Sequence, residues 1–289
     1  MSIAAIAGIT AFVIRELKIK NPVVDLKVLK NRNVLVGAAL SLAFGMPINV
    51  SVFLYPVFVQ GFLGWNATRT GLLILPSSFL TGMLMGLNGT LLQKGVSPKI
   101  LVLVGFAAVI GYEIITYFLA TPASGEWNWF WPQMIRGFGF GFIFVPVAGL
   151  TLSGLKGNEI AQASGLSNML GLLGGAIGIA VTNTFVTRRF ATHRADLIGN
   201  ISLYNPESNE RFFNLVKGCQ SQGKSLSEAQ QMAAGALEGA VSFQSAVISY
   251  SEGFLLIGII FQCILPLVFF AKINKGEKVD LGLLIKILP

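Results

Sequence analysis

Long apolar stretches dominate the pattern of hydrophobic and polar positions along this chain of 289 residues. Each of the major stretches is roughly 20 residues or longer, the length that a helix needs to cross about 30 Å of hydrocarbon. Because a backbone in lipid must satisfy its amides within its own segment, these stretches predict transmembrane helices. They lie at about 34–60, 70–92, 99–121, 128–152, 160–186 and 246–271.

A shorter apolar run occupies 3–14, ahead of a basic linker that ends near residue 33. The run is only about half as long as a membrane span requires. It resembles either the end of a span that begins outside this sequence or a shallow amphipathic start. A signal peptide would carry its basic residues before the apolar run, whereas Arg15, Lys18 and Lys20 follow it here.

The segment 187–245 is the one long polar connection between expected spans. It predicts helical stretches at roughly 207–218 and from near Ser225, the second continuing into the last span. Ser225 and Glu228 have the spacing of a capping box, in which hydroxyl and carboxylate satisfy each other's backbone donors. The segment is too small and polar for an independent enzyme domain, so we expect a structured lid or spacer.

Composition and charge placement fit a membrane protein. Mean hydropathy is +0.70, and charged residues make up 12% of the chain, about half the share in soluble domains. The net charge of +8 does not indicate a nucleic-acid partner, because most Lys and Arg fall in short connections where they set topology. One side, formed by the linker 15–33, the turn 93–99, the turn near 156 and the tail 272–289, carries 13 Lys and Arg, and the other side carries seven. Six of those seven lie in the long segment 187–245, and long loops count less in setting topology. The distribution predicts a cytoplasmic C-terminus and an outer segment 187–245.

The outer side should also carry an aromatic belt of Trp127, Trp129 and Trp131. No catalytic constellation stands out in the sequence. The single histidine, His193, lies beside arginines in the long outer segment, where a solvated side chain is expected. There is no nucleotide-binding lysine loop, no paired-cysteine motif and no metal-ligand cluster. The sequence therefore favours neither an enzyme nor a cofactor.

Several expected spans are punctuated by glycine and proline, which let helices bend and approach one another closely. One span reads Thr70 to Pro76, another Arg136 to Gly141, and a third Ala163 to Gly178. The residues expected to serve packing or gating are Pro76, Gly137, Gly139, Gly141, Pro146, Gly174, Gly175 and Gly178.

Taken in order, these motifs resemble the carboxy-terminal half of the fourteen-helix drug:proton antiporters (EmrB/QacA type) of the major facilitator superfamily. The lead-in Pro22 to Leu26 and the entry Gln244 to Phe254 also match that pattern. The resemblance implies an all-α polytopic membrane protein: the C-terminal helix bundle of such a transporter, with about six full transmembrane helices plus an N-terminal half-span. Its parts would be 1–33, a partial helix and basic cytoplasmic linker; 34–186, five spans; 187–245, an extracytoplasmic, partly helical loop; 246–271, the last span; and 272–289, a cytoplasmic tail.

The function implied by this resemblance is half of a secondary active transporter in the inner membrane. It would export amphipathic drugs or toxic compounds by alternating access, driven by protons. Its partners would be the lipid bilayer, a small-molecule substrate and an amino-terminal transporter half, with a periplasmic adaptor and an outer-membrane channel as further candidates. The alternatives are a truncated or split-gene fragment without transport activity, and an exporter of another cargo such as a lipid or siderophore.

The sequence departs from the family pattern in three ways. Met169 follows the Ser-Asn pair where the family often has a basic residue. The turn 93–99 resembles the superfamily's gating loop without its acid. The amino-terminal half, which by resemblance carries the best-established proton-coupling acids, has no counterpart in this sequence.

Ionisable groups within spans are expensive in lipid and are therefore candidate functional residues. Glu113 and Arg136 fall at similar depth in consecutive antiparallel spans. They form either a structural ion pair or a site where Glu113 takes up a proton and Arg136 displaces it. Glu252, near the outer end of the last span, is either a wet interfacial acid or an attractant for cationic drugs.

Uncharged residues in the spans supply candidates for a substrate cavity. Asn49 and Asn168 would form interhelical hydrogen bonds or contact a ligand. Aromatic side chains would line a cavity for large aromatic cations, or else face lipid and neighbouring helices. These candidates are Tyr55, Phe79, Phe140 and Phe144.

Overall fold

A computed structural model describes residue 15 and residues 32–152, 158–200 and 206–270 of the chain. All regular secondary structure in these ranges is α-helical, as the long apolar runs predict. In chain order the helices are α2 (Arg32–Phe62), α3 (Ala67–Gln93), α4 (Pro98–Leu119), α5 (Glu126–Leu152), α6 (Asn158–Asn200), α7 (Pro206–Ser221) and α8 (Leu226–Phe270).

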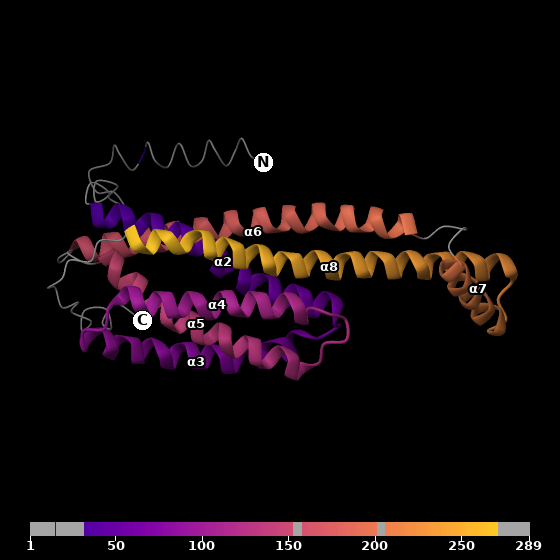
Figure 1. Cartoon of the computed structure of the whole chain (residues 1–289), viewed down its shortest axis with the longest axis horizontal. Helices are drawn as coiled ribbons and strands as arrows, with labels where there is room; N and C mark the ends of the chain where they lie inside the picture. The colour runs from indigo at the N-terminus through magenta and orange to yellow at the C-terminus, as the bar shows by residue number, and fades with distance from the viewer. Residues whose placement is uncertain (1–14, 16–31, 153–157, 201–205, 271–289) are drawn as a thin grey trace.

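The long helices run side by side in one bundle (Figure 1). Helix α2 packs against α6 and α8, while α5 packs between α3 and α4. Contacts between α4 and α8 and between α2 and α5 join these two groups. An aromatic cluster fills the junction: the Trp129 ring centroid lies 5.2 Å from Tyr55, 5.5 Å from Phe58 and 6.3 Å from Phe254.

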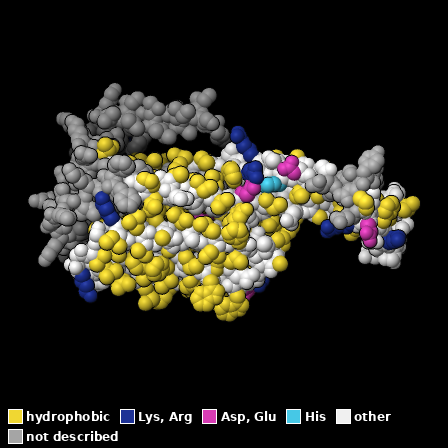
Figure 2. Space-filling view, in the orientation of Figure 1, with side chains coloured by type: hydrophobic (Ala, Val, Ile, Leu, Met, Phe, Trp, Pro, Cys, Tyr) yellow, Lys and Arg dark blue, Asp and Glu magenta, His cyan; other side chains and the backbone are white. Residues whose placement is uncertain are grey.

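Five helical segments are long and apolar enough to cross a membrane: 37–62, 67–93, 98–119, 160–199 and 226–266. The expected span at 128–152 forms α5, which has the same length as α3 but is not among these five segments. Helix α5 nevertheless lies between two of the apolar helices. Hydrophobic side chains cover the visible face of the bundle, and charged ones gather toward its ends and on the extension (Figure 2).

Glycines bring α2 and α6 into backbone contact. A Cβ atom added at Gly174 would overlap the carbonyl group of Leu42, and one at Gly178 would lie 2.8 Å from the Met46 carbonyl oxygen. At Gly175 the added Cβ would lie 2.6 Å from the side chain of Asn49. Real Cβ atoms do not approach this closely, so these positions accept only glycine at the present helix spacing.

The glycines of α5 face alternate neighbours. Gly137 lies against the backbone of Ser77 in α3, and Gly141 lies against Leu84 in the same helix. Gly139 points the other way, and a Cβ there would lie 2.9 Å from the carbonyl oxygen of Gly105 in α4. Residues four apart share a helix face while residues two apart do not. The Gly-x-Gly-x-Gly spacing therefore lets α5 approach two helices at once.

Helices α6 and α8 extend past the bundle (Figure 1). Helix α8 has 45 residues, about 68 Å at 1.5 Å per residue, roughly twice the thickness of a bilayer core. Helix α7 packs on its far end through Val216, Ala229 and Ala233. Helix α6 continues past the expected end of the fifth span at residue 186 and ends at Asn200.

Side-chain contacts with α8 explain why the polar residues after 186 stay helical. Arg189 pairs with Glu252, and Arg194 pairs with Glu238. The predicted capping box at the start of α8 is confirmed: the Ser225 amide donates to Glu228 over 3.0 Å, and the Glu228 amide donates to the Ser225 hydroxyl over 3.3 Å.

The predicted aromatic belt is wrong for one tryptophan. Trp127 and Trp131 are 73% and 65% exposed, as an interfacial belt requires, whereas Trp129 is fully buried in the aromatic cluster. All three lie in the first turns of α5. Residues two positions apart point to opposite sides of a helix, so only the outer two share a face.

Candidate functional site

A cluster of buried polar side chains lies inside the bundle between α2, α4 and α5. Glu113 of α4 is fully buried and Arg136 of α5 is 3% exposed. Ser51 of α2 is also fully buried and faces both of them. Charged groups in apolar surroundings cost several kcal/mol each unless they are paired, so this cluster is the strongest candidate site in the described part of the chain.

Arg136 is held by backbone and aromatic groups. Its Nη1 donates to the carbonyl oxygen of Ser51 at 3.4 Å. The guanidinium carbon lies 5.8 Å from the ring centroid of Tyr112 and 5.9 Å from that of Phe140, distances at which a cation is attracted to a ring face. Its Nε has no hydrogen-bond partner among the described protein atoms.

Glu113 lies in the same cluster but is not paired with Arg136. Ion pairs in the described ranges join Arg69 to Glu126, Arg189 and His193 to Glu252, and Arg194 to Glu238. The Ser51 side chain lies beside the Glu113 carboxyl group, but neither carboxyl oxygen makes a hydrogen bond of ordinary distance and angle in the described ranges. Arg136 acts electrostatically on Glu113, so the two side chains occupy one buried region of the bundle. The direct ion pair is not formed in this conformation.

Sequence reasoning missed four polar side chains that surround this pair. Tyr112, Thr116 and Gln133 are fully buried, and each has side-chain polar atoms without a described partner, as does Ser51. A signal for two of them was present in the sequence. Thr116 follows Glu113 by three positions and Gln133 precedes Arg136 by three, the spacing that places residues on one helix face.

Glu252 is occupied by two cationic partners. Both of its oxygens accept hydrogen bonds from Arg189, and Oε1 also lies 3.0 Å from Nε2 of His193. The expectation of a solvated loop histidine is wrong, since His193 lies on α6 and its side chain is 18% exposed. These contacts join α6 to α8, and the role of Glu252 as an attractant for cationic drugs stays a prediction.

The expected cavity residues separate into buried and exposed groups. Tyr55 and Phe140 lie in the core and pack within the bundle. The side-chain amide of Asn49 donates to the Gly45 carbonyl of its own helix over 2.8 Å, so the expected interhelical bond is replaced by contact with Gly175. Phe79, Phe144 and Asn168 are exposed on the surface. The assignment of these residues to a substrate cavity stays a prediction.

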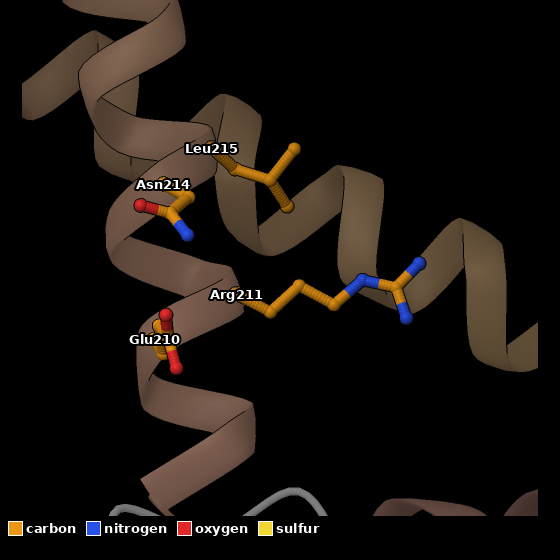
Figure 3. A pocket seen from close by; sticks show the side chains of 4 residues that line it. All are labelled: Glu210, Arg211, Asn214 and Leu215. Atoms are coloured by element: carbon orange, nitrogen blue, oxygen red, sulfur yellow. The ribbon is translucent and has the colours of Figure 1, made fainter.

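A shallow hollow of about 380 Å³ lies on α7, away from the buried cluster. Glu210, Arg211, Asn214 and Leu215 line it, and Figure 3 shows the Arg211 side chain extending away from Glu210. No group of three His, Cys, Asp or Glu side chains able to hold a metal ion occurs in the described residues. The hollow is open surface on the extension.

Comparisons with known proteins point to one superfamily. Residues 2–179 match the family model described as Major Facilitator Superfamily. Multidrug export protein EmrB of Escherichia coli K12 is 32% identical over 276 residues, which cover 94% of this chain and 51% of the relative. Fatty acid resistance protein FarB of Neisseria gonorrhoeae is 32% identical over 274 residues, covering 94% and 52%. Colistin resistance protein EmrB of Acinetobacter baumannii is 24% identical over 277 residues, again covering 94% and 52%. The chain spans about half the length of the curated relatives it matches.

Proposed function

The chain belongs to the major facilitator superfamily, and on this premise we propose that it forms half of a proton-coupled exporter of amphipathic toxic compounds. The observation that carries the proposal is the similarity, over nearly the whole chain, to a multidrug export protein and two resistance proteins. Alternating access by two rocking helix bundles is the mechanism that we infer. The described bundle would be one of the two.

An apolar face on α3 supports a second bundle as the partner. Helix α3 packs mainly on α5, and its other side carries a stripe of exposed apolar residues spaced three or four apart. The stripe consists of Leu72, Leu75, Phe79, Met83 and Leu87, which are 47% to 68% exposed. Because the relatives are about twice as long as the matched chain, we propose that the remaining half of such a transporter packs opposite this stripe. Phe79 would then face the substrate path.

The proposed orientation of the chain across the membrane follows from the distribution of Lys and Arg. The turn 93–99 holds Lys94 and Lys99 and would be cytoplasmic, as would the C-terminus. The extension formed by α7 and the outer parts of α6 and α8 would then project into the periplasm from the inner membrane. This projecting surface is the part of the chain that we propose for contact with a periplasmic adaptor and, through it, an outer-membrane channel.

The relative named for fatty acid resistance favours a second cargo class. A fatty acid is amphipathic like many drugs but carries a negative charge. A lipid-like cargo therefore remains the alternative to cationic drugs, and a chain without transport activity of its own remains the alternative to a carrier half.

Complementation of an efflux-deficient strain tests the proposal. The chain would be expressed alone and together with the amino-terminal half of E. coli EmrB, and resistance to cationic dyes and to fatty acids would be measured. We expect resistance only on co-expression, and the compound class that is rescued identifies the cargo. Absence of rescue by an inserted, folded chain would contradict the carrier function.

A matched pair of variants tests the role of the α3 stripe in the same strain. Phe79 and Phe118 are 68% and 71% exposed apolar residues on different helices. We expect Phe79→Ala to change the range of exported compounds and Phe118→Ala to leave it unchanged. Equal effects of the two substitutions on the range of exported compounds would refute the proposal that the stripe faces the substrate path.

A further inference from the structure

Unpartnered polar groups continue from the Glu113–Arg136 cluster toward one end of the bundle. In the described ranges, eleven buried residues have side-chain polar atoms without a hydrogen-bond partner, and eight of them belong to the helices around this cluster. These eight come from three adjoining helices: Ser51 and Tyr55 of α2; Tyr112, Glu113 and Thr116 of α4; and Trp129, Gln133 and Arg136 of α5. We call these eight residues the polar track.

The polar track leads toward one end of the bundle, because its residues follow one another at intervals of one helical turn. Tyr55 lies one turn beyond Ser51, and Thr116 lies one turn beyond Glu113, in both cases toward the C-terminal end of the helix. Helix α5 runs the other way, so Gln133 lies one turn from Arg136 toward its N-terminal end. All three shifts lead to the end of the bundle where α2 and α4 finish and α5 begins.

The track is short enough to reach that surface. Glu113 lies six residues before the end of α4 at Leu119, about 9 Å at 1.5 Å per residue. Thr116 lies about half as far from the helix end. By the charge distribution that places the turn 93–99 in the cytoplasm, this end of the bundle is the outer one.

Leaving these groups without partners would be too costly for a folded bundle. Each buried unsatisfied polar group costs about 1–3 kcal/mol, and the eight residues together would cost an amount comparable to the entire stability of a domain, about 5–15 kcal/mol. Buried polar sites of this kind are satisfied by water when each water finds two to four polar partners. The track supplies donors and acceptors at every turn.

We propose that Glu113 is the proton-binding residue of this carrier half and that the polar track conducts protons to it from the outer side. This assignment rests on the proposed function, since a proton-driven exporter needs a proton-binding group that both sides reach in turn. Arg136 is its counter-ion, and Thr116 and Gln133 are positioning residues that line the route.

The cycle conserves charge and protons. A proton from outer water passes along the track and binds a carboxylate oxygen of Glu113, which becomes a neutral acid. Arg136 then interacts with the Ser51 carbonyl and the Tyr112 and Phe140 rings, as in this conformation. After the bundles rock, the proton leaves toward the cytoplasm. The carboxylate that remains pairs with Arg136, which replaces the lost proton as its compensating charge.

The surroundings of Glu113 favour it over Glu252 as the proton-binding residue. The described charged and titratable groups that act on it are Arg136 from α5 and Tyr112 from its own helix, whereas α2 places Ser51 beside it and α8 places Gly258 against its Cβ. Glu252, in contrast, is held by two cationic side chains. A carboxylate with permanent cationic partners gains little from binding a proton, so it suits a structural role.

Infrared difference spectroscopy of the full chain in lipid nanodiscs tests the assignment without requiring transport. A protonated carboxyl group gives its own C=O band, which shifts in D2O. We expect a band that titrates with pH, disappears in Glu113→Gln and persists in Glu238→Gln, whose carboxylate is exposed. Persistence of the band in Glu113→Gln, or no titrating band in the wild type, would overturn the assignment.

The route is tested by the rate at which this band exchanges its proton for deuterium. We expect Thr116→Val and Gln133→Leu to keep the band and to slow its exchange by about tenfold, a change of about 1.4 kcal/mol in the barrier. Thr116→Val conserves shape, so it remains informative if Glu113→Gln fails to fold by circular dichroism. Unchanged exchange in both variants would refute the track.

The two proposals fail in different ways. A titrating Glu113 band in a chain that never supports export would support the proton site and refute the transport function. Export with unchanged proton coupling in Glu113→Gln would support the transport function and refute Glu113 as the proton site.

Discussion

The contact between α2 and α6 gives the sharpest stability prediction. In α6, Gly174 lies against the carbonyl group of Leu42, and a Cβ atom there would overlap it. Gly165 lies in the same helix and is exposed, with no atom within 4 Å of the position its Cβ would take. The substitutions Gly174→Ala and Gly165→Ala therefore add the same methyl group to one helix in two different surroundings.

The magnitude follows from two opposing effects. Replacing glycine by alanine inside a helix is favourable by about 1 kcal/mol, and this gain is common to both variants. The overlap at Gly174 is with backbone atoms that cannot rotate away, so the helices must separate, at a cost of about 1–3 kcal/mol. Because the propensity gain cancels in the comparison, the free energies of unfolding should differ by about 1–3 kcal/mol.

Unfolding of each variant in mild detergent by added dodecyl sulfate, followed by circular dichroism, measures this difference. We expect Gly165→Ala to be as stable as the wild type or more stable, and Gly174→Ala to be the less stable of the pair. Equal unfolding midpoints and slopes for the two variants would refute the reasoning. They would mean that α2 and α6 are not in backbone contact in the folded chain.

Three further predictions use matched pairs and the same unfolding measurement. Trp129→Ala should destabilise the chain by about 3–5 kcal/mol because it leaves a cavity in the aromatic cluster. Trp127→Ala should have little effect because that side chain is 73% exposed. Similar losses of stability in the two variants would contradict the inward orientation of Trp129. Asn88 donates to the Gly141 carbonyl of α5 over 2.9 Å, so Asn88→Leu should cost about 0.6 kcal/mol, the typical value for interhelical bonds in membranes. Thr90→Val should cost less, because Thr90 bonds only within its own helix; a reversed order would count against the α3–α5 bond. Arg189→Gln should lower the free energy of unfolding by up to about 1 kcal/mol in a salt-dependent manner and speed amide hydrogen exchange at 189–200. Arg188→Gln should do neither, because Arg188 is exposed. Equal exchange rates in both variants would refute the role of the Arg189–Glu252 pair in joining α6 to α8.

The sequence predicted the helices of the bundle well because lipid leaves the backbone few choices. Runs of about 20 apolar residues can only be helices in a bilayer, and glycines such as Gly139 and Gly174 correctly indicated close helix contacts. The extent of α6 was not predictable in this way. Residues after 186 are polar, and they stay helical through contacts with α8 at Glu252 and Glu238, which lie 63 and 44 positions away from their partners.

The candidate site was only partly predictable for a related reason. Burial cost identifies Glu113 and Arg136 from sequence alone. Whether they form a direct ion pair depends on how α4 and α5 are rotated, and periodicity within each helix does not fix that rotation. Tyr55 shows the same limit, since an aromatic residue in a span can face a cavity, lipid or the core, and here it packs against Trp129.

Substrate-driven proton movement in proteoliposomes tests the central claim most directly. The chain would be reconstituted together with the amino-terminal half of E. coli EmrB, with a pH-sensitive dye inside the vesicles and a gradient of a cationic drug across the membrane. The account predicts that the drug gradient drives protons in the opposite direction, and that Glu113→Gln abolishes this flux while Glu238→Gln leaves it intact. Drug movement without proton flux, or a flux that Glu113→Gln leaves unchanged, would contradict it.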